Sequence, residues 1–275
     1  DRLRAVHREA RRGRRPAQRP LGGTVEDGMR FARLVTLLPP THRPLVLTAH
    51  GSADPRSAAS AHEVAHTIRR VRRDVDVRVA FCEQNTPNLR DVLAASPRNA
   101  VVVPLLLADA YHARVDIPTM IGESGSAARQ ADVLGEDDRL VHVLRQRLAH
   151  AGVSQLDPDV GVLVTAVGSS RRQANARTAS VANYLAQNTR WTATIAFATG
   201  PHPSLAEAAD VLRDRGATRL VIAPWFLAHG RITDRVATFA RANGIAMAEP
   251  LGPHRLVAET VLDRFDEAAA ARVAA

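Results

Sequence analysis

Short apolar runs recur along the chain, and longer amphipathic stretches separate them. The runs are rich in β-branched residues and alternate little with polar ones, a pattern typical of strands buried on both faces. We expect strands at 44–49, 75–81, 99–107, 160–166, 192–198, 219–226 and 245–248. We expect helices at 57–73, 87–95, 118–132, 141–150, 171–187, 203–215, 233–243 and 254–270. This alternation predicts an α/β protein with parallel sheets flanked by helices.

The same order of segments occurs twice. LVLTAHGS (45–52) recurs as VLVTAVGS (162–169), and VVVPLLLAD (101–109) recurs as LVIAPWFLAH (220–229). Self-similarity at a steady offset indicates a duplicated structural unit. We therefore predict two tandem duplicated domains with a cleft between them. The predicted division is a basic N-terminal extension (1–41), a first domain (42–154) and a degenerate second domain (155–275).

The two copies differ at positions that can carry chemistry. Three side chains able to bind a metal or a proton in the first copy have no basic counterpart in the second. The aligned pairs are His50 with Val167, Glu83 with Thr199, and His112 with Ile232. We therefore expect one site, in the first copy.

Each of these three residues follows a different predicted strand of the first copy. The carboxyl ends of parallel strands meet at one sheet edge, where ligands collect, so we expect His50, Glu83 and His112 to converge. Two imidazoles and a carboxylate can bind a divalent transition metal and leave positions open for a substrate. Imidazole can also accept a proton near neutral pH. HGSADPR (50–56) adds a turn before a helix, whose backbone amides suit an anionic group.

Composition narrows the class of protein further. No apolar run in the 275 residues approaches the length that a bilayer requires. One cysteine, Cys82, fits a reducing cytoplasm, and its apolar neighbours indicate a buried position rather than a reactive thiol. The net charge is +9, and ten arginines lie in residues 1–40. The first 20 of these residues, DRLRAVHREARRGRRPAQRP, contain no aromatic residue for stacking, so we expect a disordered extension rather than a nucleic-acid site.

A second motif offers a rival hypothesis. HEVAH (62–66) matches the H-E-x-x-H pattern, in which two histidines on one helix face bind zinc and Glu63 acts as the base of a hydrolase. No downstream pattern supplies a third ligand, and the motif lies within the helix, away from the strand ends. We interpret it as an exposed face of an amphipathic helix.

The motifs at the strand ends resemble those of a known protein family. The segments HGSADPR (50–56), AFCE (80–83) and PLLLADAYHARVDIP (104–118) resemble the sirohydrochlorin chelatases, the class II chelatases that insert cobalt or ferrous iron into a tetrapyrrole. Ala53 and Ala110 stand where that family usually has arginine and glycine. The resemblance covers about 44–270, in the long two-unit form of the family.

The resemblance implies roles for the candidate residues. His50 and His112 would bind the metal and take up pyrrole protons, with Glu83 assisting. Fe²⁺ or Co²⁺ would be a substrate, with no permanently bound cofactor. The other substrate would be sirohydrochlorin, which carries eight carboxylates. Its expected contacts are Gly51, Ser52, Arg56, Arg114 and Asp116.

Alternatives remain open at this point. A metal or tetrapyrrole carrier without catalysis would use the same cleft, and the HExxH hydrolase is a third reading. The ligand types do not distinguish iron from cobalt, and therefore siroheme from cobalamin synthesis. We expect a cytoplasmic monomer or homodimer, with no membrane partner.

Overall fold

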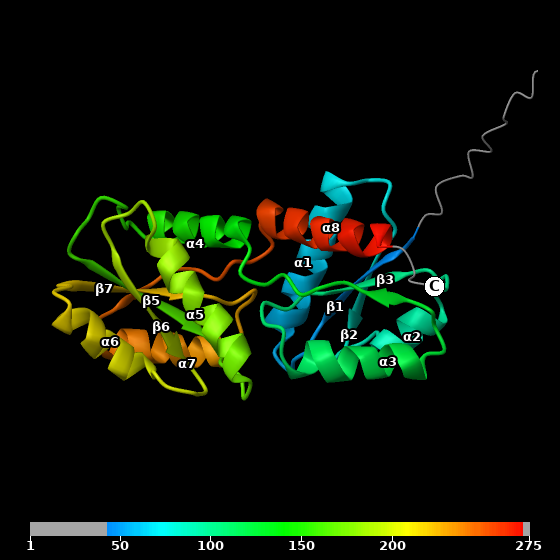
Figure 1. Cartoon of the computed structure of the whole chain (residues 1–275), viewed down its shortest axis with the longest axis horizontal. Helices are drawn as coiled ribbons and strands as arrows, with labels where there is room; N and C mark the ends of the chain where they lie inside the picture. Colours follow the sequence, from blue (N-terminus) through cyan, green and yellow to red (C-terminus); the bar gives the residue numbers. More distant parts are fainter. Residues whose placement is uncertain (1–42, 272–275) are drawn as a thin grey trace, which may run out of the picture. The chain divides into compact units, whose positions relative to one another are not determined.

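The computed structural model describes residues 43–271, and the predicted basic extension lies outside these residues. Each half of the chain forms a parallel sheet (Figure 1). The first has the order β2-β1-β3-β4 and the second the order β6-β5-β7-β8. The strands are β1 Leu45–Ala49, β2 Val77–Phe81, β3 Val101–Pro104, β4 Arg129–Gln130, β5 Val160–Ala166, β6 Thr192–Phe197, β7 Arg219–Pro224 and β8 Ala246–Met247. The predicted α/β class is confirmed.

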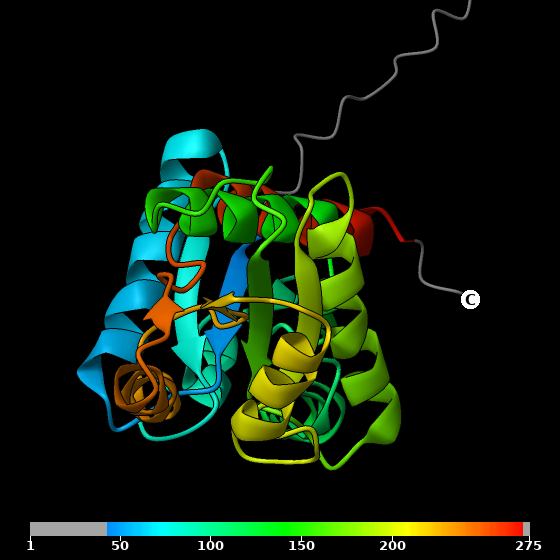
Figure 2. The ribbon, with the colours of Figure 1, turned by 90° about the vertical axis from the view of Figure 1, so that its left-hand side faces the viewer.

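Helices follow the strands and cover the sheets (Figures 1 and 2). They are α1 Pro55–Val71, α2 Leu89–Ala94, α3 Ile117–Glu123, α4 Asp138–His150, α5 Arg172–Ala186, α6 Leu205–Asp214, α7 Arg231–Ala242 and α8 Arg255–Ala270. A π-helix, His112–Asp116, precedes α3. Polar caps fix several of the starts. Asp54, for example, accepts a hydrogen bond from the Arg56 backbone nitrogen, and Pro55 stands at the first position of α1.

The strand pairing confirms the duplication. Thr48 of β1 lies opposite Pro104, and Thr165 of β5 lies opposite Pro224 in the same register. The central strands β1 and β5 are buried along their whole lengths. The carboxyl ends of β1 and β2 point to one edge of the first sheet, where the candidate residues follow.

One predicted helix is wrong in its second part. The expected helix 118–132 ends at Glu123, and Arg129–Gln130 instead form β4 beside β3. The intervening segment contains Gly125 at φ 66°, a conformation that favours glycine and ends helices. In the second half, α7 continues to Ala242 before β8. The connection between the paired strands is longer in the first half (105–128) than in the second (225–245), and the extra length lies after the π-helix.

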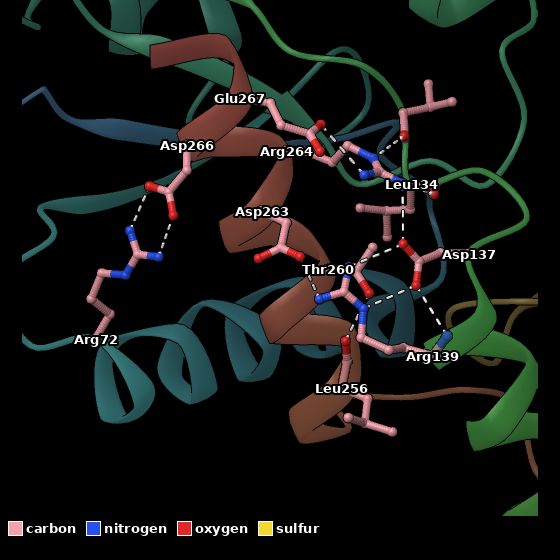
Figure 3. A network of polar contacts seen from close by, with 11 residues as sticks. Arg72, Leu134, Asp137, Arg139, Leu256, Thr260, Asp263, Arg264, Asp266 and Glu267 are labelled. Atoms are coloured by element: carbon pink, nitrogen blue, oxygen red, sulfur yellow. Dashed lines mark hydrogen bonds and ion pairs between the residues drawn. The ribbon is translucent and has the colours of Figure 1, made fainter. Parts of the chain in front are cut away.

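The last helix of each copy packs against the other copy. α8, at the end of the second copy, packs against α1 and β3, while α4, at the end of the first, packs against α5 and β7. Figure 3 shows the polar contacts that hold α8 in place. Asp137 at the start of α4 accepts hydrogen bonds from Arg139 and from Arg264 of α8, and Arg72 pairs with Asp266. All described residues belong to one compact unit. The predicted boundary at 154/155 falls in the connection between α4 and β5.

Candidate active site

The loop after β1 is locked to the loop after β2. Gly51 has φ 96°, and a Cβ atom there would lie 1.7 Å from the backbone oxygen of Glu83. The Glu83 amide donates to the His50 carbonyl at 3.0 Å, and the Ser52 amide donates to Asn85 Oδ1 at 2.7 Å. Only glycine permits this close approach in the left-handed region. The packing places Glu83 Oε1 3.5 Å from His50 Nδ1.

His112 comes from the π-helix that follows β3. π-Helices are rare, and single π-helical turns lie frequently at functional sites. The imidazole of His112 meets that of His50 edge to face, with ring centroids 3.8 Å apart and an interplanar angle of 79°. The structure thus brings together the three residues expected at the sheet edge, His50 with His112 and His50 with Glu83.

Hydrogen bonds assign the free nitrogen of each imidazole. His50 Nδ1 lies 2.8 Å from the Gly51 carbonyl oxygen, and His112 Nδ1 lies 2.5 Å from Asp116 Oδ2. A carbonyl oxygen and an ionised carboxylate only accept, so each Nδ1 carries the proton. With Nδ1 donating, the neutral form of each ring has its lone pair on Nε2, available to a metal ion or to an incoming proton.

The three candidate residues do not form a complete set of metal ligands. Within residues 43–271, no three His, Cys, Asp or Glu side chains converge closely enough to hold an ion by themselves. The rings of His50 and His112 are in contact, and an ion bonded to both nitrogens at about 2.1 Å requires more room. An ion bonded to both rings would therefore need them to move apart.

The predicted substrate-binding arginines already have carboxylate partners. Arg56 pairs with Asp54 and with Asp234 of α7, and the hydrogen bonds that Arg56 donates to Asp54 lower the pKa of Asp54 to about 2. Arg114 pairs with Asp109, whose pKa its guanidinium holds below the ordinary range. Both guanidinium groups are about half exposed, so a substrate carboxylate can compete with these aspartates.

Sequence reasoning missed two features of the site. Asn85 anchors the Ser52 amide, and no pattern in the sequence singles it out. Asp116 makes no capping hydrogen bond to α3, and its side chain instead contacts His112. The i, i+4 spacing of His112 and Asp116 was the available signal for this pair.

The second copy keeps the loop and lacks the ligands. Gly168 has φ 95°, and a Cβ there would lie 1.7 Å from the Gly200 oxygen, as at Gly51. Thr199, at the position of Glu83, donates its hydroxyl to the Val167 carbonyl at 2.8 Å. The scaffold therefore persists with a backbone hydrogen bond where the first copy presents a carboxylate.

The rival motif and the cysteine behave as predicted. His62, Glu63 and His66 are exposed on α1. Cys82 is 4% exposed, and burial raises the pKa of its thiol to about 12, which makes it unreactive near neutral pH. No helix in the described range is long and apolar enough to cross a bilayer.

A cavity of about 740 Å³ borders the π-helix at Ala113, and it is lined by Asp109, Glu136 and Arg177. Burial raises the pKa of Glu136. None of His50, Glu83 and His112 lines this cavity.

Two duplicated parallel sheets, with one set of strand-end ligands, define an α/β protein with a chelatase-like fold. The family model CbiX matches residues 44–151 and 161–268, so the chain belongs to the CbiX family, and the predicted resemblance to sirohydrochlorin chelatases is confirmed. The matched ranges coincide with the two copies.

Curated relatives and solved structures agree with this assignment. The chain is 25% identical over 208 residues to a sirohydrochlorin cobaltochelatase of Priestia megaterium, covering 70% of this chain and 66% of the relative. It is 30% identical over 138 residues to a sirohydrochlorin ferrochelatase of the same organism, covering 46% of this chain and 50% of the relative. The chain thus spans less than two thirds of either relative.

The fold is similar to that of the chelatase SirB from Bacillus subtilis subspecies spizizenii, solved in complex with cobalt. The TM-score is 0.65 at 21% identity, over 82% of this chain and 95% of that one. A structure described as CbiX, the terminal enzyme for biosynthesis of siroheme in denitrifying bacteria, gives a TM-score of 0.63 at 21% identity, over 82% and 99% of the two chains.

Proposed function

We propose that the protein inserts a divalent metal ion, ferrous iron or cobalt, into sirohydrochlorin. The observation that carries the proposal is the pair of contacting imidazoles, His50 and His112, each with Nδ1 engaged and Nε2 free. The family and the two curated relatives support the choice of a tetrapyrrole, and the relatives' names include both metals.

Insertion of M²⁺ removes two pyrrole N–H protons and joins the ion to the four nitrogens of the macrocycle. The two imidazoles first hold the ion through Nε2. As each metal–imidazole bond is exchanged for a metal–pyrrole bond, the freed Nε2 accepts a pyrrole proton. Glu83, 3.5 Å from His50 Nδ1, adds negative charge that stabilises the protonated ring.

The carboxylates of the macrocycle need cationic partners at the rim. Arg56 follows His50 by six residues and Arg114 follows His112 by two, and both side chains are about half exposed, so we assign them this role, in exchange for Asp234 and Asp109. Gly51 and Ser52 line the same loop. We place the enzyme in the cytoplasm, with the first copy catalytic and the second supporting it.

The test is anaerobic insertion by the purified full chain, followed by the absorbance change of sirohydrochlorin with Fe²⁺, Co²⁺ or Ni²⁺. We expect multiple turnovers with Fe²⁺ or Co²⁺, and loss of turnover in His50→Ala and His112→Ala with the fold retained. Unchanged turnover in both variants would contradict the proposal. Stoichiometric binding without turnover would instead identify a carrier.

A further inference from the structure

Asp116 makes the shortest polar contact to either candidate imidazole. Its Oδ2 lies 2.5 Å from His112 Nδ1, and both side chains are about one third exposed. The backbone of this segment is π-helical, which sets the relative position of the two side chains. The contact is therefore built into an unusual backbone rather than made by two free surface side chains.

The contact determines which nitrogen of His112 faces the reaction. Because an ionised carboxylate only accepts hydrogen bonds, Nδ1 must donate, and Nε2 retains its lone pair. In His50 the Gly51 carbonyl does the same task at 2.8 Å. Both rings therefore carry the proton on Nδ1. His50 donates it to a backbone carbonyl, whereas His112 donates it to a side chain that a mutation can remove.

The second copy has neither member of the pair. Ile232 stands at the position of His112, Val236 stands at that of Asp116, and α7 is regular there. Val236 is buried in the apolar core. The carboxylate is present only in the copy that has the histidine it contacts.

We infer that Asp116 is a positioning residue, which fixes the orientation and the tautomer of His112 so that Nε2 is presented beside His50. This assignment replaces contact with the substrate as the role of Asp116. A carboxylate already bonded to His112 would also repel a substrate rich in carboxylates. The inference rests on the proposed function for its kinetic consequence, and on the hydrogen bond alone for its structural one.

The decisive variant is Asp116→Asn in the full chain. Asparagine keeps the shape, but its amide nitrogen can donate to Nδ1 and move the ring proton to Nε2. Removing an outer partner of a metal-binding histidine typically costs about 10–100-fold in metal affinity or activity. We expect a fall in kcat of about that size, with the KM for sirohydrochlorin unchanged. We expect a similar fall in kcat for Asp116→Ala.

A second readout does not depend on activity. In the ¹⁵N-imidazole NMR spectrum, with His112→Ala used for assignment, the wild-type His112 should carry its proton on Nδ1, and Asp116→Asn should shift it to Nε2. The matched control is Glu249→Gln, which removes the carboxylate from His229, a pair 2.7 Å apart in the second copy. It should leave kcat and the His112 signals unchanged.

The outcomes distinguish a failure of the positioning role of Asp116 from a failure of the proposed metal insertion. An unchanged tautomer with kcat within twofold of wild type in Asp116→Asn overturns the positioning role, and so does a raised KM at constant kcat, which indicates substrate contact. If the wild type itself inserts no metal, the proposed function fails. The NMR result and the Co²⁺ affinity of the variant, followed by cobalt absorption, then still decide the role of Asp116.

Discussion

The two glycines at the strand ends allow a matched test of the loop geometry. Gly51 and Gly168 have φ 96° and 95°, and at each an added Cβ would lie 1.7 Å from a backbone oxygen, of Glu83 or of Gly200. The two sites are therefore nearly equal in backbone geometry. They differ in what the neighbouring strand end carries, which is a candidate metal ligand in the first copy only.

The magnitude follows from two costs. An alanine in the left-handed region costs about 1–2 kcal/mol, and the lower entropy of the unfolded chain returns about 0.4–1 kcal/mol. The clash is with backbone, so no rotamer relieves it, and overpacking of this kind costs about 1–3 kcal/mol or more. We expect Gly51→Ala and Gly168→Ala each to lower the free energy of unfolding by about 2–4 kcal/mol. At Gly244, φ is 62° and nothing lies near the Cβ position, so Gly244→Ala should lower the free energy of unfolding by only about 1 kcal/mol.

The assay is urea unfolding of the three variants, followed by metal insertion at a temperature where all are folded. Gly51→Ala should lose insertion, because the shift needed to relieve the clash moves Glu83 away from His50. Gly168→Ala should keep kcat near that of the wild type. The reasoning is refuted if Gly51→Ala is as stable as Gly244→Ala, or if Gly168→Ala loses as much activity per folded molecule as Gly51→Ala.

Further predictions concern the candidate substrate contact Arg56, the HEVAH motif, helix α8 and the carboxylate of Asp137. Arg56→Gln should raise the KM for sirohydrochlorin, whereas Asp234→Asn, which frees Arg56 from one partner, should leave it equal or lower; the opposite order in steady-state kinetics would contradict the proposed carboxylate contact. Glu63→Gln should leave metal insertion unchanged, and a peptidase activity lost in this variant would revive the HExxH hypothesis. Phe265→Ala should lower the unfolding free energy by about 3–5 kcal/mol in urea titrations, because this side chain of α8 is 6% exposed. Burial opposes ionisation of Asp137, but hydrogen bonds from Arg residues still lower its pKa, so its contribution is present above pH 3.8 and is lost as pH falls through the folded pKa. Unfolding at pH 7 and pH 2 should therefore show a destabilised Asp137→Asn at pH 7, by about 1–3 kcal/mol, and a much smaller difference at pH 2.

The sheets could be predicted because their strands are buried on both faces. The run 160–166 has one polar residue, Thr165, and the observed β5 has these same bounds. The strand β4 was missed, since Arg129–Gln130 is two residues long and neither is apolar. Its place depends on pairing with β3, a long-range contact that no local pattern encodes.

The candidate metal-binding residues could be predicted from the sequence, but most of the contacts around them could not. Strand ends and the comparison of the copies identify His50, Glu83 and His112, because topology brings such positions together. The π-helix and the contact of Asp116 depend on one local backbone irregularity. Arg56 is engaged by Asp234, which lies far away in sequence. The sequence shows that such a residue is charged but does not show which distant residue it pairs with.

The packing of α8 and of α4, each against the opposite copy, gives the second copy a structural role. α8 covers α1 and β3 of the first copy, and α4 covers the second. Loss of the imidazole at position 167 removes no core contact, because Val167 is 39% exposed. Loss of α8 would instead uncover apolar surface beside β3, the strand that leads to His112. Selection can therefore relax at the strand ends of the second copy while still acting on its packing, which is the pattern seen here: the Gly168 loop is intact around positions that no longer bear ligands.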